Sequence, residues 1–253
     1  MKKFLKFFKP FEWFLLLTII TLTIIASSFN PNTTFAESFF TIETLSAICG
    51  VINVVLAAKG HISNFAFGII QCALYAFCCY RESVYGNAVL YSLYFLPMQF
   101  VGYFSWRKKL KSDGSNEVVS RFMNLRQSII AYSITLAGIV ALYFILKYVN
   151  GQAAIFDAAS TVFNIVAMVM MVKGFTDQWY LWILVNISSL GIWAYRAVNG
   201  DADAVSPANL IFCAMWFVYL LNSIHGLVVW RRNAVSNEEY ESIDTSKKIG
   251  RNE

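Results

Sequence analysis

The chain contains few charged residues for its length. Only 14% of its 253 residues are charged, whereas about 25% are charged in an average soluble domain. The charges are also clustered, so long uncharged stretches lie between them, and 58% of all residues are hydrophobic. Because a membrane-spanning helix needs about 20 apolar residues, this distribution predicts an integral membrane protein and leaves no room for a second, soluble domain.

Groups that support metal, redox or catalytic chemistry are also scarce. The only histidines are His61 and His225, too few to form a cluster of metal ligands. The five cysteines are odd in number and contain no Cys-x-x-Cys pair, which favours a role as small apolar fillers. No nucleophile with a base and no pair of carboxylates lies at the centre of an apolar stretch. We therefore expect no metal, no cofactor and no enzymatic activity.

Hydropathy predicts an all-α integral membrane fold with eight spans. The candidate spans are residues 11–29, 38–58, 62–80, 85–106, 127–149, 153–172, 179–197 and 207–230. The first could alternatively be a signal peptide, but its apolar run is long and no A-x-A cleavage site follows, which favours a retained span. The polar tail at 233–253 lacks apolar periodicity and is predicted to be disordered.

Basic residues predict how these spans are oriented. With eight spans, all the segments and loops rich in basic residues fall on one side of the membrane. Their basic residues are Lys2, Lys3, Lys6, Lys9, Lys59, Arg107, Lys108, Lys109, Lys111, Arg121, Arg126, Lys173, Arg231 and Arg232. By the positive-inside rule, both termini then face the cytoplasm. The opposite loops hold Glu37, Arg81, Glu82, Gly151, Asp201 and Asp203. The net charge of +5 thus indicates membrane topology rather than nucleic-acid binding.

Two parts of the chain resemble one another. Residues 43–60 (ETLSAICGVINVVLAAKG) match 157–174 (DAASTVFNIVAMVMMVKG) at an offset of 114. Residues 96–107 (LPMQFVGYFSWR) match 220–231 (LLNSIHGLVVWR) at an offset of 124. Two collinear matches indicate a duplicated three-span unit. Because three is an odd number, the intervening span at 127–149 gives both units the same orientation, in a parallel 3+1+3 arrangement with one extra N-terminal span.

This duplication divides the chain into five parts. We predict an N-terminal segment with the extra span (1–37), a first repeat (38–106), a loop with a linker span (107–152), a second repeat (153–232) and the tail (233–253). Parallel repeats are typical of transporters that bind their substrate between the two halves. A duplicated scaffold without a pore is the alternative, and the polar helix faces disfavour it.

Residues 179–197 (WYLWILVNISSLGIWAYRA) carry the most specific pattern in the chain. Trp182, Asn186, Ser189 and Trp193 follow one another at spacings of four, three and four residues, which places them on one helix face. Burying an unpartnered amide costs roughly 2–7 kcal/mol, so this face suits a flat, polar, aromatic ligand better than lipid. Further candidates near span centres are Phe67, Gln71, Tyr75, Gln99, Tyr219 and Asn222.

Other polar and aromatic residues in the spans have equally good structural explanations. Asn53 and Asn164 fit ties between helices as well as they fit a binding site. Tyr94, Trp193 and Trp216 fit the aromatic belt at the membrane interface equally well. The sequence alone leaves these alternatives open.

No lysine or arginine lies at the centre of any predicted span. A phosphorylated ligand would require such a cation. Proton-driven carriers usually bury a titratable group on the transport path. We therefore expect a neutral or mildly cationic, unphosphorylated ligand that crosses by facilitated diffusion.

The helix with Trp182, Asn186 and Trp193 on one face, preceded by Gln178, resembles that of the PnuC family of vitamin B3 transporters, over about residues 38–232. The resemblance implies a fold like that of the sugar facilitators called SWEETs. It also implies uptake of nicotinamide riboside across a bacterial inner membrane, followed by trapping through a cytoplasmic kinase. Facilitators of thiamine, riboflavin or a sugar stay open as alternatives, and exposed aromatic surfaces could support a homo-oligomer.

The same resemblance implies roles for particular side chains. Trp182 would stack on the pyridinium ring, and Asn186 would bind the carboxamide or the ribose. The pocket would be closed from other helices by Gln71, Tyr75, Tyr219 and Asn222.

Overall fold

Helices are the regular elements of this protein. The computed structural model describes residues 7–27, 41–111, 114–148, 154–199 and 207–249, and all elements in these ranges are helical. They are α2 (Pro10–Ser27), α4 (Ile42–Lys59), α5 (Asn64–Arg81), α6 (Tyr85–Val89), η1 (Leu90–Phe95), α7 (Leu96–Arg107), α8 (Leu125–Tyr148), α9 (Ala154–Lys173), α10 (Gln178–Asn199) and α11 (Pro207–Ile249). The predicted all-α fold is confirmed. The predictions for Lys2, Lys3, Lys6, Glu37, Gly151, Asp201 and Asp203 lie outside the described residues.

Several of these helices fit a membrane. Four are long and apolar enough to cross one within the described ranges, at Ile42–Lys59, Leu125–Tyr148, Gln178–Val198 and Ala208–Asn237. A shorter apolar helix comprises Pro10–Ile25. Because a helix satisfies its own backbone polar groups, a bundle of such helices suits the bilayer interior.

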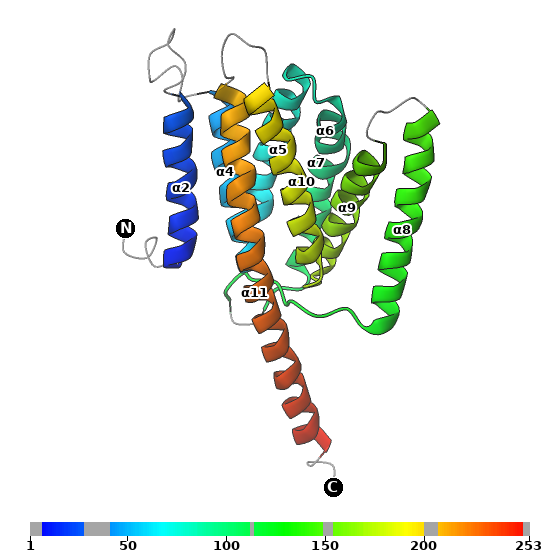
Figure 1. The fold of residues 1–253 in the computed structure, drawn as a ribbon. Coiled ribbons are helices and arrows are strands. Elements are labelled where there is room, and N and C mark those ends of the chain that lie inside the picture. Colours follow the sequence, from blue (N-terminus) through cyan, green and yellow to red (C-terminus); the bar gives the residue numbers. More distant parts are fainter. Residues whose placement is uncertain (1–6, 28–40, 112–113, 149–153, 200–206, 250–253) are drawn as a thin grey trace.

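The helices stand side by side, with α2 at one edge of the molecule and α8 at the opposite edge (Figure 1). Between them, α4 packs against α5 and α11, α10 packs against α9 and α11, and α9 also contacts α7 and α8. Successive long helices run in opposite directions, so α4, α7 and α9 end at the same end of the bundle. Lys59, Arg107 and Lys173 lie in the last turns of these helices, and we call this end the basic end.

One long helix contains a π-helical stretch. It runs from α6 through η1 to α7, and the π turns end two residues before Pro97. Proline has no backbone N–H and its ring clashes with the carbonyl four residues earlier in an α-helix. Wider π turns before the proline accommodate this change, and such stretches are frequent at functional sites. Tyr91 and Phe95, which belong to η1, line the central cavity described below.

Both Lys-Gly pairs end their helices in the same way. Gly60 follows α4 with a φ of 73°, and Gly174 follows α9 with a φ of 78°. Glycine adopts this left-handed conformation without the steric cost of a Cβ atom. The next helices, α5 and α10, begin after residues 61–63 and 175–177. The two matched sequence segments thus form the same local structure.

A strap, residues 114–124 between α7 and α8, connects these two turns across the basic end. The Val118 N–H donates to the Gly60 carbonyl at 2.8 Å, and the Arg121 N–H donates to the Gly174 carbonyl at 3.1 Å. Single β-bridge pairings accompany both contacts. The strap therefore joins the ends of α4 and α9, which lie far apart in the sequence.

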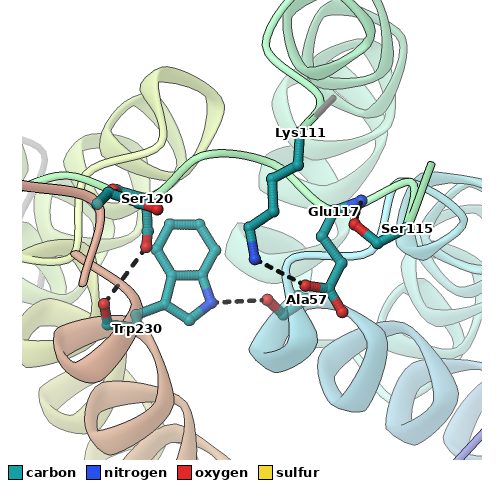
Figure 2. A network of polar contacts seen from close by, with 7 residues as sticks. Ala57, Lys111, Ser115, Glu117, Ser120 and Trp230 are labelled. Atoms are coloured by element: carbon teal, nitrogen blue, oxygen red, sulfur yellow. Dashed lines mark hydrogen bonds and ion pairs between the residues drawn. The ribbon is translucent and has the colours of Figure 1, made fainter. Parts of the chain in front are cut away.

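The strap also contacts α11 (Figure 2). The Ser120 hydroxyl donates to the Trp230 carbonyl at 3.4 Å, and the Trp230 indole N–H donates to the Ala57 carbonyl at 3.0 Å. Nearby, Lys111 and Glu117 form an ion pair at 2.9 Å. Strap, α4 and α11 are thus held together at one point.

Helix α11 is longer than the sequence suggested. The tail at 233–253 was expected to be disordered, but α11 continues to Ile249, so this prediction is wrong for residues 233–249. No glycine or proline occurs between Gly226 and Gly250 to stop the helix. The first residues of this extension are also packed, because Ala234 is fully buried and the Asn237 side chain donates to the Ser120 carbonyl at 3.0 Å.

Helix α2 packs against α4 and α11. Its buried Glu12 carboxylate pairs with Lys59 at 3.3 Å and accepts from the Lys9 N–H at 2.8 Å. Lys59 also donates to the Phe7 carbonyl and lies over the Phe7 ring. These contacts attach α2 to the basic end of α4.

Candidate functional site

A cavity lies at the centre of the bundle, between α4, α5, η1, α7, α9, α10 and α11. Its volume is about 80 Å³. The predicted site residues that line it are Gln71, Gln99, Trp182, Asn186, Tyr219 and Asn222. Further lining residues include Asn53, Tyr91, Phe95, Trp179, Trp216 and Ser223. None of the described residues that line the cavity is a lysine, arginine, histidine, aspartate or glutamate.

Buried polar atoms without a hydrogen-bond partner gather around this cavity. In the part of the chain that the structure describes, three can donate: Nε2 of Gln71, Nε1 of Trp179 and Oη of Tyr219. Three more can accept: Oδ1 of Asn53, Oε1 of Gln99 and Oδ1 of Asn222. Leaving one such group unpaired costs about 1–3 kcal/mol. A ligand with both donors and acceptors would recover that free energy.

Trp182 forms an aromatic wall of the cavity together with Phe95. Their ring centroids lie 6.1 Å apart, with the planes tilted by 32°. The Trp182 indole N–H donates to Oε1 of Gln178 at 3.2 Å, and Gln178 is 1% exposed. The indole is therefore held in place one turn from the start of α10, where a flat ring can stack on it.

Asn186 and Asn222 combine a structural role with a place in the lining. The Asn186 amide nitrogen donates to the Tyr219 carbonyl at 3.1 Å and to the Ser223 hydroxyl at 3.2 Å, which ties α10 to α11. The Asn222 amide nitrogen donates to the Val54 carbonyl at 2.8 Å, which ties α11 to α4. The Asn222 carbonyl oxygen stays without a partner.

Two glycines make room for polar side chains of the cavity. A Cβ atom at Gly68 would overlap Oε1 of Gln99, and one at Gly50 would overlap Oη of Tyr219. Gly68 corresponds to Trp182 in the repeat alignment at offset 114. Of these two matched positions, one therefore carries an indole and the other leaves space, so the cavity is asymmetric.

Tyr75 and Trp193, which were predicted to contact the ligand, lie beside the cavity rather than in its lining. The Tyr75 hydroxyl accepts hydrogen bonds from the indoles of Trp193 at 2.9 Å and Trp216 at 3.1 Å. The Tyr75 ring also packs against Phe212 at 5.0 Å. These four residues form an outer aromatic cluster, on the side away from the basic end. The remaining predicted site residues, Phe67 and Ser189, do not line the cavity.

A second, inner aromatic cluster closes the side toward the basic end. Phe65 packs on Trp106 at a centroid distance of 4.9 Å, Trp106 on Trp230 at 5.8 Å, and Trp179 on Trp230 at 6.0 Å. All four side chains are buried. The cavity thus lies between two layers of aromatic rings.

Sequence reasoning missed several lining residues. Tyr91 and Phe95 lie in the π-helical stretch, where the facing of side chains cannot be read from the usual period of 3.6 residues. Trp179 begins the specific sequence segment, yet nothing in its spacing separates it from an interface tryptophan. Asn53 and Trp216 were noted with structural alternatives, and the structure places both in the lining.

An apolar helical bundle around a polar, aromatic cavity, with no charged residue among the described lining, defines a membrane transport protein for a small organic molecule. Comparison with known families names the kind of transporter. The chain belongs to the nicotinamide mononucleotide transporter family, whose model matches residues 40–232.

Individual relatives agree with this assignment. The chain is 32% identical over 187 residues to the nicotinamide riboside transporter PnuC of Neisseria mucosa, which covers 73% of this chain and 68% of the relative. It is 31% identical over 196 residues to the PnuC of Haemophilus influenzae, which covers 76% and 83%. It also matches the crystal structure of the vitamin B3 transporter PnuC with a TM-score of 0.74 and 29% identity, covering 90% of this chain and 94% of the other.

These comparisons decide three predictions made from the sequence. The resemblance based on Trp182, Asn186 and Trp193 is confirmed. The family consists of transporters and not enzymes, as predicted. Thiamine, riboflavin and sugars are not favoured as substrates, because the matched relatives are named for nicotinamide riboside.

Proposed function

We propose that this protein takes up unphosphorylated nicotinamide riboside by facilitated diffusion. The central observation is the cavity, which combines aromatic walls with unpartnered amide groups and lacks charged residues among its described lining. The relatives named as nicotinamide riboside transporters support the same ligand. Its pyridinium ring is flat and cationic, and its carboxamide and ribose offer both donors and acceptors.

Trp182 and the amides have distinct roles in this proposal. Trp182 stacks on the pyridinium, an interaction worth about 1–2 kcal/mol in a desolvated site. Asn186 binds the carboxamide or the ribose. The donor on Gln71 and the acceptors on Gln99 and Asn222 each lack a partner in the protein. These three groups pair with the remaining polar groups of the ligand.

The absence of charge in the lining separates the riboside from its phosphorylated form. The family description names the mononucleotide, whereas the curated relatives are named for the riboside. A buried phosphate carries up to two negative charges, which arginine or lysine side chains balance. The described lining supplies no cation, so we expect the mononucleotide to be rejected.

The proposed architecture is the parallel 3+1+3 arrangement, like that of SWEETs, with α2 as the extra helix and α8 as the linker. Reciprocal contacts support it. The Trp106 indole donates to the Met171 carbonyl at 2.9 Å, and the Trp230 indole donates to the Ala57 carbonyl at 3.0 Å. These partners correspond at offsets of 124 and 114. Each third helix thus contacts the first helix of the other half.

A second pair of corresponding contacts follows the same pattern. A Cβ atom at Gly102 would meet the Phe65 ring, and one at Gly226 would meet the Trp179 ring. Gly102 corresponds to Gly226, and Phe65 to Trp179, at the same two offsets. The inner aromatic cluster is therefore built from two equivalent halves, as a pseudo-twofold axis along the membrane normal would require.

The transport mechanism we propose is alternating access between the two halves. Pockets that bind small molecules measure about 300–1,000 Å³, and this cavity measures about 80 Å³, so the halves must separate before the riboside enters. The outer and inner aromatic clusters would open in turn. No ion gradient is required, and a cytoplasmic kinase makes uptake one-way by phosphorylating the riboside.

By the positive-inside rule, we expect the bundle to lie in the inner membrane of a bacterium with its basic end facing the cytoplasm. In the described ranges, this end carries the strap and the last turns of α4, α7 and α9 with their basic residues. Both termini then lie in the cytoplasm, next to the kinase. A homo-oligomer stays a prediction.

Calorimetric titration of the purified protein with nicotinamide riboside tests this proposal. We expect binding of the riboside, no binding of the mononucleotide, and a loss of affinity of roughly 5- to 30-fold in Trp182→Ala from the missing stacking contact. Ile187 lies on the same helix and is 53% exposed, so Ile187→Ala serves as the control and should bind normally.

Two results would contradict parts of the proposal. Equal affinity for the mononucleotide would overturn the argument from the missing cations. Unchanged affinity in Trp182→Ala would overturn the stacking role.

A further inference from the structure

A groove separate from the central cavity runs between α8 and α9 and opens at the basic end. Its volume is about 430 Å³. Its walls are apolar, formed by Ile130 and Ile134 of α8 and by Val166 and Val169 of α9. Ile130, Ile134 and Val169 are 48%, 60% and 37% exposed, so the groove faces the surroundings of the bundle rather than its core.

Two cations lie at one end of this groove. Arg121 comes from the strap, and Lys173 from the last turn of α9. The Arg121 guanidinium lies over the Phe175 ring, 4.7 Å from its centroid, and the Arg121 backbone is fixed by hydrogen bonds to both Gly174 and Thr176. Among the described residues, neither cation forms an ion pair with a carboxylate.

A third cation shows how concentrated the positive charge is. The Lys109 ammonium group donates to the Ser105 hydroxyl at 3.1 Å and to the Val172 carbonyl at 3.3 Å. Burial lowers the pKa of Lys109, and the nearby charges of Arg121 and Lys173 lower it further. The carboxylate of Asp177 accepts from the Met123 N–H at 3.1 Å and does not neutralise this cluster through an ion pair in the described structure.

We propose that this groove binds an anionic phospholipid. The headgroup phosphate lies between Arg121 and Lys173, and one acyl chain follows the apolar walls of α8 and α9. Basic pockets between membrane helices on the cytoplasmic side bind acidic lipid headgroups. A water-soluble anion would use the two cations but not the apolar walls, and a zwitterionic lipid would use the walls without matching the charge.

The location fits a lipid of the inner leaflet. This step rests on the proposed orientation, in which the basic end faces the cytoplasm, where anionic lipids give the membrane surface a negative potential. Helix α8 contacts α9 and is otherwise exposed along nearly all of its described length. Because Arg121 belongs to the strap and Lys173 to α9, one headgroup would join the two.

Lipid binding to the purified full-length protein in neutral detergent tests the proposal. The probes are phosphatidylglycerol, phosphatidylcholine with the same acyl chains, and glycerol 3-phosphate as the headgroup without chains. We expect phosphatidylglycerol to bind much more tightly than either of the others. The double variant Arg121→Gln, Lys173→Gln should weaken its binding about 30-fold.

Two further variants separate charge from shape. Ile134→Trp fills the groove without changing any charge and should also weaken phosphatidylglycerol binding. Lys147→Gln removes a cation at the other end of α8, over the Tyr143 ring, and should have no effect. Riboside binding, measured on the same samples, should be retained by all of these variants, because none of the residues lines the central cavity.

The outcomes distinguish this site from the transport function. Equal binding of phosphatidylcholine, equal binding of glycerol 3-phosphate, or normal binding of phosphatidylglycerol by the double variant would each overturn the lipid site. If the unmodified protein does not bind the riboside, this would count against the proposed function and would leave the lipid result unaffected.

Discussion

The asparagines of the bundle show how one side chain can have two roles. An asparagine within a span, such as Asn222, can either tie helices together or contact a ligand. The structure shows that its amide nitrogen bonds to the Val54 carbonyl while its carbonyl oxygen is left without a partner beside the cavity. Because an amide has separate donor and acceptor groups, the two explanations are compatible. The sequence could locate such residues but could not divide their functions.

Glycine at position 68 is expected to matter for binding more than for folding. In Gly68→Ala, the new methyl group would displace the flexible Gln99 side chain. The closest neighbours of this methyl group are all side-chain atoms, so the backbone need not move. We expect weaker riboside binding with little change in thermal stability, measured by calorimetry and by a melting curve. Gly191→Ala is the matched control, since its Cβ meets nothing within 4 Å in helix α10.

Alanine at a helical glycine raises helix propensity by up to about 1 kcal/mol. Gly191→Ala should therefore be neutral or slightly stabilising, with normal affinity. Normal riboside affinity in Gly68→Ala as well would show that Gln99 is not needed in its present position.

Most of the helices could be predicted from the sequence, because each is a long apolar run between clusters of charge. The predicted span at 85–106 corresponds to Tyr85–Arg107, and the one at 127–149 to Leu125–Tyr148. The π stretch was not predictable, since it depends on how Pro97 is accommodated. The strap and the helical extension at 233–249 were missed because tertiary contacts, such as Asn237 to Ser120, stabilise segments without apolar periodicity.

The strap makes Gly174 a sensitive position for stability. Its φ of 78° disfavours any residue with a Cβ by about 1–2 kcal/mol, and a Cβ there would also lie 3.2 Å from the Val119 carbonyl oxygen of the strap. We expect Gly174→Ala to lower the melting temperature of the purified protein.

Gly114 provides the comparison for this prediction. It has a φ of 75° but an open surrounding, with nothing within 4 Å of an added Cβ. Gly114→Ala should therefore cost only the backbone strain and lower the melting temperature less. Equal losses in both variants would show that the contact between strap and α9 adds no stability.

At the scale of the whole molecule, a small cavity lies between two aromatic clusters. The sequence predicted much of the lining of this cavity. The candidates Trp182, Asn186, Gln71, Tyr219 and Asn222 all line it. Tyr75 and Trp193 lie beside the cavity instead, since helix periodicity gives the face of a residue but not its depth in the bundle. That depth depends on contacts between helices, such as the hydrogen bond from Trp193 of α10 to Tyr75 of α5.

The most direct test of the account is uptake of labelled nicotinamide riboside into liposomes that contain the purified protein, with no ion gradient imposed. We predict that the riboside equilibrates across the membrane, that the mononucleotide stays outside, and that a proton gradient changes neither result. Uptake that requires the gradient, or equal entry of the mononucleotide, would contradict facilitated diffusion of an unphosphorylated substrate through this uncharged cavity.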